Sequence, residues 1–97
     1  MDRRREPRIP VELPGSYRTE GRTCRMYYSQ ISSQGCRLSG LEHTFEPGDT
    51  IEVSLGPIGP IDATVRWSRD GSVGIEFESA LEAEVVAYFA AIIPCAA

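Results

Sequence analysis

Short runs of alternating apolar and polar residues recur between residues 11 and 78. In residues 60–69 the apolar positions are Ile61, Ala63, Val65 and Trp67, and a period of two is that of a half-buried strand. Comparable runs cover residues 11–18, 23–30, 35–40, 47–56 and 72–78. Six short strands with turn signals between them predict a small, mainly β, six-stranded antiparallel barrel. The alternation predicts that Trp67 faces the core, although an aromatic residue at a barrel rim can instead stack on a base.

The period of the apolar positions changes from two to a helical spacing after residue 78. Ser79 followed by Glu82 is a capping-box signature, and Pro94 ends the run. These features predict one C-terminal helix that covers an opening of the barrel. Its apolar positions are Leu81, Val85, Tyr88, Phe89 and Ile92.

The first ten residues do not fit either pattern. Pro7 and Pro10 favour an extended backbone there and prevent a helix. A chain of 97 residues is typical of one domain. We therefore expect a single domain over residues 1–97, with a flexible arm at 1–10, a barrel at 11–78 and a helix at 79–93.

The formal net charge is −4, but the charges are unevenly distributed. Residues 1–25 carry seven arginines against four acids, and residues 26–97 carry three arginines against ten acids. The remaining surface is therefore too acidic for general DNA or RNA binding, which needs a broad basic face. A small anion is a better match to the local positive charge of the first segment.

The cysteines and the apolar runs indicate the compartment. No run approaches the roughly 18–20 apolar residues that cross a bilayer, and the arginine-rich start lacks the apolar core of a secretory signal. Three cysteines, at positions 24, 36 and 95, have neither the even number of a disulfide framework nor the spacing of a zinc site. We expect reduced cysteines, with Cys24 and Cys36 buried, in a cytoplasmic protein without a cofactor or a membrane-inserted segment.

Two short motifs carry candidate chemistry. Arg4 and Arg8 stand four residues apart on the arm, and Ser32 and Gly35 lie in the stretch Gln-Ile-Ser-Ser-Gln-Gly at residues 30–35. Taken separately, the first can be a solvated terminus and the second a serine-rich turn closed by a glycine. Their combination and order are more specific than either motif alone.

With these motifs the chain resembles the PilZ domain family. That family combines an R-x-x-x-R motif with a later [D/N]-x-S-x-x-G motif, on a six-stranded barrel with a C-terminal helix. The stretches at residues 45–55 and 61–77 are also similar to the family, so the resemblance covers nearly the whole chain. It implies binding of cyclic di-GMP, a bacterial second messenger with two phosphates and two guanines.

The resemblance assigns ligand-binding roles to five residues: Arg4, Arg8, Gln30, Ser32 and Gly35. An arginine fork can pair with a phosphate or with guanine O6 and N7, and a serine hydroxyl can donate to the ligand. Gly35 would permit either a close backbone approach or a positive φ. Arg3 and Arg5 are weaker candidates, and the position of Arg3, just before the first motif arginine, is where the family varies the number of ligand molecules held. Arg69 is a weaker candidate for an auxiliary contact, and a solvated hairpin position is the simpler interpretation.

Gln30 departs from the family pattern, which has Asp or Asn at this position. Glutamine keeps the amide oxygen but adds a methylene and carries no negative charge. Loss of one good base-edge contact costs about 1–3 kcal/mol, roughly 5- to 150-fold in affinity. The alternative function is therefore a PilZ-like domain with weakened or lost ligand binding that acts only through protein contacts.

Catalysis is disfavoured by the sequence. His43 is the single histidine, it is expected in a solvated loop, and no nucleophile stands at a useful spacing from it. The expected partners are cyclic di-GMP and an unidentified downstream protein. The expected oligomeric state is a monomer or a weak homodimer, with Tyr88 and Val86 on the exposed side of the helix.

Overall fold

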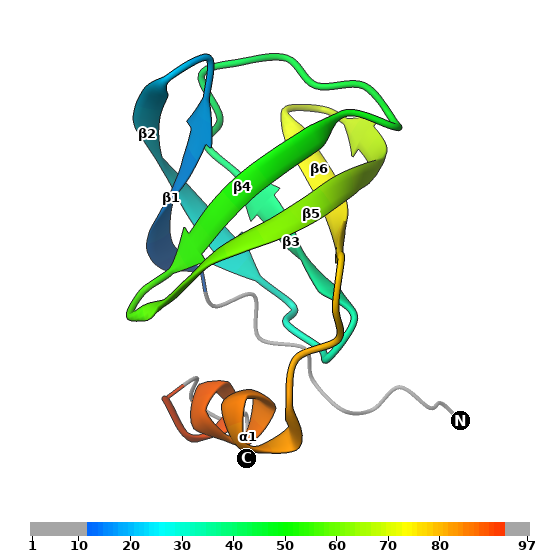
Figure 1. Ribbon diagram of the computed structural model, residues 1–97. Coiled ribbons are helices and arrows are strands. Elements are labelled where there is room, and N and C mark those ends of the chain that lie inside the picture. Colours follow the sequence, from blue (N-terminus) through cyan, green and yellow to red (C-terminus); the bar gives the residue numbers. More distant parts are fainter. Residues whose placement is uncertain (1–11, 93–97) are drawn as a thin grey trace, which may run out of the picture.

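A computed structural model of the chain describes residues 12–92. Six strands and one helix follow one another along the chain, and they are drawn in Figure 1. They are β1 (Leu13–Thr19), β2 (Arg22–Ser29), β3 (Gly35–Ser39), β4 (Thr50–Leu55), β5 (Ile58–Arg69), β6 (Ser72–Phe77) and α1 (Ala83–Ile92). The predicted mainly β architecture is confirmed.

The strands form a closed barrel in the order β1-β2-β3-β6-β5-β4, and every neighbouring pair is antiparallel. Closure removes the free sheet edges that a small open sheet would expose. Most of the alternating apolar residues point inward, as the sequence pattern predicts. Buried side chains such as Tyr17, Met26, Leu38, Val53 and Val65 fill the interior.

Cys24 and Cys36 belong to this core as free, buried thiols, in agreement with the sequence analysis.

Two tight hairpins use residues with positive φ. Glu20 and Gly21 join β1 to β2, and Asp70 and Gly71 join β5 to β6. Positive φ at both central residues is the geometry of the hairpin turn that matches strand twist.

Helix α1 lies across one opening of the barrel, as Figure 1 shows. Phe89 is its fully buried anchor, and the ring contacts Tyr28 edge to face with 5.9 Å between the ring centroids. Leu81 and Val85 pack against the same core. Tyr88 remains exposed on the helix. No helix within residues 12–92 is long and apolar enough to cross a membrane.

The helix begins later than its sequence signature predicts. The capping box places the start at Ser79, whereas α1 begins at Ala83. The backbone amide of Leu81 donates instead to the carbonyl of Ser33, 2.8 Å away, so this part of the chain is held by a loop of the barrel. The carbonyl of Glu82 then accepts the first helical hydrogen bonds, from Val85 and Val86.

The long connection between β3 and β4 lies at the end of the barrel away from α1 (Figure 1). It carries His43, which is half-buried rather than solvated, so that expectation was wrong. His43 Nδ1 lies 2.7 Å from the hydroxyl of buried Tyr17, and the Glu42 amide donates to that hydroxyl at 3.1 Å. Desolvation by burial raises the pKa of Tyr17. His43 therefore fastens a loop to the core.

Candidate ligand-binding site

The loop between β2 and β3 is shaped by its own polar groups. The backbone N–H of Ser32 donates to the Gly35 carbonyl at 2.9 Å, and the backbone N–H of Gln34 donates to Ser32 Oγ at 3.1 Å. The Ser32 hydroxyl lies 3.4 Å from the Gly35 carbonyl, a long contact for an O–H donor. Ser32 is exposed, so its proton can turn to an incoming acceptor while its oxygen still supports the loop.

The same loop is fixed to two other elements. The carbonyl of Gln34 accepts a hydrogen bond of 2.7 Å from the Phe77 amide at the end of β6. The carbonyl of Ser33 accepts the Leu81 amide from the segment that leads into α1. Residues 32–35 therefore present their side chains from a backbone that is hydrogen-bonded on both sides.

Gly35 is needed for close packing. A Cβ on this residue would overlap the backbone carbonyl oxygen of Ile75 on the neighbouring β6. Gly35 is not among the residues with positive φ, so close approach is the correct choice between its two expected roles. Gln30, in contrast, has φ of 53°, a left-handed conformation that Asn, Asp and Gly adopt more readily than longer side chains.

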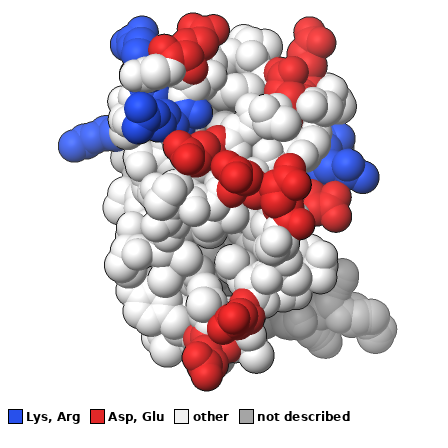
Figure 2. All heavy atoms as spheres, viewed as in Figure 1, with Lys and Arg blue, Asp and Glu red and all other residues white. Residues whose placement is uncertain are grey.

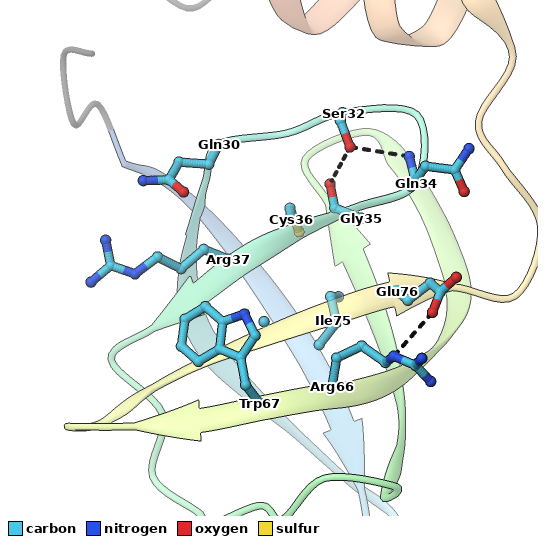
Figure 3. A pocket seen from close by; sticks show the side chains of 11 residues that line it. Gln30, Ser32, Gln34, Gly35, Cys36, Arg37, Arg66, Trp67, Ile75 and Glu76 are labelled. Atoms are coloured by element: carbon cyan, nitrogen blue, oxygen red, sulfur yellow. Dashed lines mark hydrogen bonds and ion pairs between the residues drawn. The ribbon is translucent and has the colours of Figure 1, made fainter. Parts of the chain in front are cut away.

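These loop residues border a pocket of about 300 Å³ on the outer wall of β3, β6 and β5, here called the Trp67 pocket. Figure 3 shows Gln30, Arg37 and the indole of Trp67 gathered at one end, and Ser32, Gln34 and Glu76 toward the other. The structure thus brings Gln30, Ser32 and Gly35 together with residues that the sequence analysis did not assign to the site, among them Arg37, Arg66 and Trp67.

The prediction that Trp67 faces the core is wrong, because Trp67 is 36% exposed. A bulge between Val65 and Trp67 adds one residue to β5, and such an insertion moves the following side chain to the other face. Gly74 pairs with Trp67 across the strands, and a Cβ there would overlap the indole. The glycine opposite the tryptophan was the available sequence signal that this ring lies flat on the sheet.

Three arginines in or near the Trp67 pocket differ in their partners. Arg69 places its guanidinium carbon 5.2 Å from the ring centroid, within the range of a cation–π contact. Arg66 Nε pairs with Glu76 Oε1 at 3.1 Å. Arg37 donates to the hydroxyl of Ser72, also at 3.1 Å. Arg69 therefore stacks on the aromatic surface and is more than a solvated hairpin residue.

Cys36 also borders the Trp67 pocket. Desolvation by burial raises the pKa of its thiol to about 12, so it stays protonated at neutral pH. The thiolate is the nucleophilic form of cysteine, and this site therefore lacks a reactive thiol. Within the described part of the chain, no three potential metal ligands gather around one point.

A second hollow, here called the acidic hollow, lies on the β1–β4–β5 side of the barrel and measures about 600 Å³. One arginine, Arg18, lines it together with four carboxylates: Glu20, Glu52, Asp62 and Glu78. Figure 2 shows acidic side chains in a band across the face where β4 and β5 lie in front. Glu52 and Asp62 are direct cross-strand neighbours.

Arg3, Arg4, Arg5 and Arg8 lie outside the described residues, so the structure gives no geometry for the first motif. A comparison with family models matches the PilZ domain over residues 2–91. A search of curated proteins found no match. The chain therefore belongs to the PilZ domain family, whose members are ligand-binding modules of cyclic di-GMP signalling.

Proposed function

We propose that this PilZ domain is a cytoplasmic receptor for cyclic di-GMP that binds the ligand at the Trp67 pocket, with Arg4 and Arg8 clamping it from the N-terminal arm. The observation that carries the proposal is the position of the second motif. Gln30, Ser32 and Gly35 border the same pocket as an exposed tryptophan. A polar loop beside an aromatic surface suits a ligand made of phosphates and purines.

The size of the pocket supports a role for the arm. A volume of about 300 Å³ is at the low end of the roughly 300–1,000 Å³ typical of pockets that enclose a drug-sized ligand. A cyclic dinucleotide would therefore leave part of its surface uncovered. Arginines from outside the barrel would cover that part and pair with the phosphates.

Each described residue has a chemical role in this proposal. Ser32 donates its hydroxyl to the ligand, and the Gln30 amide contacts a guanine edge. Trp67 stacks on a base. Arg69 already contacts the indole, and its planar guanidinium can move to stack on the base instead. Arg3 and Arg5 make auxiliary contacts from the arm.

Isothermal titration calorimetry with cyclic di-GMP tests the proposal. The wild-type chain should bind at nanomolar to micromolar concentrations, and Arg4→Ala and Arg8→Ala should each remove detectable binding. Arg22→Ala is a matched control, because Arg22 is an exposed arginine at the start of β2 and does not border the Trp67 pocket. Absence of heat with the wild type at high ligand concentration would reject the proposed ligand.

Gln30 supports a second candidate function, a PilZ domain with weakened or lost ligand binding that acts only through protein contacts. Substitution of Gln30 by Asn or Asp separates the two. A large gain in affinity indicates a degraded natural site, and little change indicates that glutamine already serves. In either case the role is binding rather than catalysis, and the signal passes to a downstream protein.

A further inference from the structure

Two arginines border the Trp67 pocket, and they are held in different ways. Arg66 forms an ion pair with the carboxylate of Glu76. Arg37 donates to the neutral hydroxyl of Ser72, a residue that is itself buried. No acidic side chain within residues 12–92 forms an ion pair with Arg37. Arg37 is therefore positioned by a hydrogen bond that leaves its positive charge available.

Arg37 also lies in one row with the tryptophan. On β3 it pairs with Gly74 of β6, and Gly74 pairs with Trp67 of β5. Neighbouring strands are about 4.8 Å apart, so two such spacings separate the backbones of Arg37 and Trp67. The residue between them has no side chain, so the Trp67 indole covers Gly74 and extends from β5 toward β3. Figure 3 shows both groups at the same end of the pocket, next to Gln30.

We propose that Arg37 selects guanine in this pocket. A base stacked on Trp67 turns one edge toward β3, where the Arg37 fork meets it. The major-groove edge of guanine offers two acceptors, O6 and N7, which fit a bidentate arginine. Adenine presents an amino donor in place of O6, and that donor faces the guanidinium unfavourably. The inference rests on the proposed binding of cyclic di-GMP and adds a specificity-determining residue outside both sequence motifs.

The position of Gln30 explains why an additional residue for guanine recognition is useful in this pocket. Ser29, the residue before Gln30, pairs with Arg37 across β2 and β3, and Figure 3 shows the Gln30 and Arg37 side chains at the same end of the Trp67 pocket. Gln30 stands where the family pattern has a carboxylate or a shorter amide. An arginine fork beside it supplies base-edge recognition that does not depend on the reach of the glutamine.

Titration of cyclic di-GMP and cyclic di-AMP into four proteins tests the inference: wild type, Arg37→Ala, Arg37→Lys and Arg66→Ala. The chain has a single tryptophan, so Trp67 fluorescence reports base stacking alongside calorimetry. We expect Arg37→Ala to lower the affinity for cyclic di-GMP by about 5- to 150-fold, with little change for cyclic di-AMP. Arg37→Lys keeps the charge but loses the fork, and should recover only a part of that affinity.

Arg66→Ala is the matched control, because it removes an arginine from the same pocket that is already paired with Glu76. It should leave the preference for guanine unchanged, and thermal melting checks that all variants fold. If the wild type binds but Arg37→Ala behaves like Arg66→Ala, or loses both dinucleotides equally, this inference is overturned and the proposed function stands. If the wild type binds no cyclic di-GMP, both are rejected.

Discussion

Two of the hollows on the barrel wall differ in volume and in the charges that line them. The acidic hollow has about twice the volume of the Trp67 pocket, but four carboxylates line it against one arginine. The Trp67 pocket has two arginines and one carboxylate, and it adds an exposed indole. A ligand with two phosphates is repelled by the first and attracted by the second. The charges that line a hollow, rather than its volume, therefore favour the Trp67 pocket as the proposed ligand site.

Strand β5 contributes residues to both hollows. The register of the strand decides which of the two hollows each of these side chains lines. Asp62 belongs to the regular part of the strand and points toward the acidic hollow. Arg66 and Trp67 stand at the bulge, and both border the other pocket. One inserted residue therefore separates an acidic part of the strand from an aromatic one.

The largest predicted effect is a loss of folding stability on substitution of Gly35, in the loop that borders the Trp67 pocket. Gly35→Ala forces a methyl group against the Ile75 carbonyl, which belongs to the barrel backbone and cannot move aside. Overpacking of this kind costs about 1–3 kcal/mol of unfolding free energy. Urea denaturation measures the loss.

Gly74→Ala is the informative comparison for this variant. The added methyl group would meet the Trp67 side chain, which can rotate away. The stability loss should be smaller, while the fluorescence emission of the single tryptophan should shift. Equal urea midpoints for Gly35→Ala and wild type would contradict the close-packing role of Gly35.

The next predicted effect is a fall in folding stability at high pH, caused by the buried thiol of Cys36 beside the Trp67 pocket. Burial raises the pKa of Cys36 to about 12, whereas an unfolded chain ionises its thiols near the ordinary value. Above about pH 9 the unfolded state therefore binds fewer protons than the folded state, and stability should fall by up to roughly 1.4 kcal/mol per pH unit. Urea midpoints at pH 8, 9 and 10 measure this slope.

Cys36→Ala provides the control for that slope. The variant removes a core side chain and will be less stable at every pH, but its stability should depend less on pH between 9 and 10. A slope equal to that of the wild type would assign the dependence to other groups. The pKa of Tyr17 and of Tyr28 is also raised by desolvation, and these groups add to the slope at higher pH.

A smaller effect is expected at Gln30, where the backbone is left-handed with φ of 53°. Gln30→Asn and Gln30→Gly should each stabilise the fold by roughly 0.5–1 kcal/mol, because both residues adopt this conformation more readily. Thermal unfolding without ligand measures the gain. A loss of stability in both variants would show that the backbone at residue 30 carries no strain.

The same pair sharpens the test of the ligand site. A gain in cyclic di-GMP affinity with Asn but not with Gly assigns the gain to the side chain. A gain with both assigns it to a better-ordered loop.

The smallest effect belongs to the acidic hollow. Asp62→Asn removes a negative charge directly opposite Glu52 and should stabilise the barrel by a few tenths of a kcal/mol at low salt. The gain should shrink at high salt, because exposed charges are screened. Cyclic di-GMP affinity should change less than twofold. A larger change in affinity would place the ligand nearer to the acidic hollow than we propose.

The alternating pattern sufficed to predict the six strands and the buried cysteines, and the helical spacing after residue 78 predicted the C-terminal helix. Alternation is a local signal, and the apolar face that it defines must be buried. The candidate roles of Ser32 and Gly35 came from the resemblance to the PilZ family, whose second motif is a short local pattern, and their contacts with a ligand stay predictions. Residues 12–92 give no test of Arg4 and Arg8, and their roles stay predictions.

The sequence by itself determined which residues could form the barrel core and which short motif could contact a ligand. Only the tertiary structure decided that Trp67 faces outward, because a bulge depends on how β5 pairs with β6. It also decided that Leu81 bonds to Ser33 and that the helix begins at Ala83. Arg37 joined the site for the same physical reason. Its neighbours Gly74 and Trp67 are distant in sequence and adjacent only through strand register.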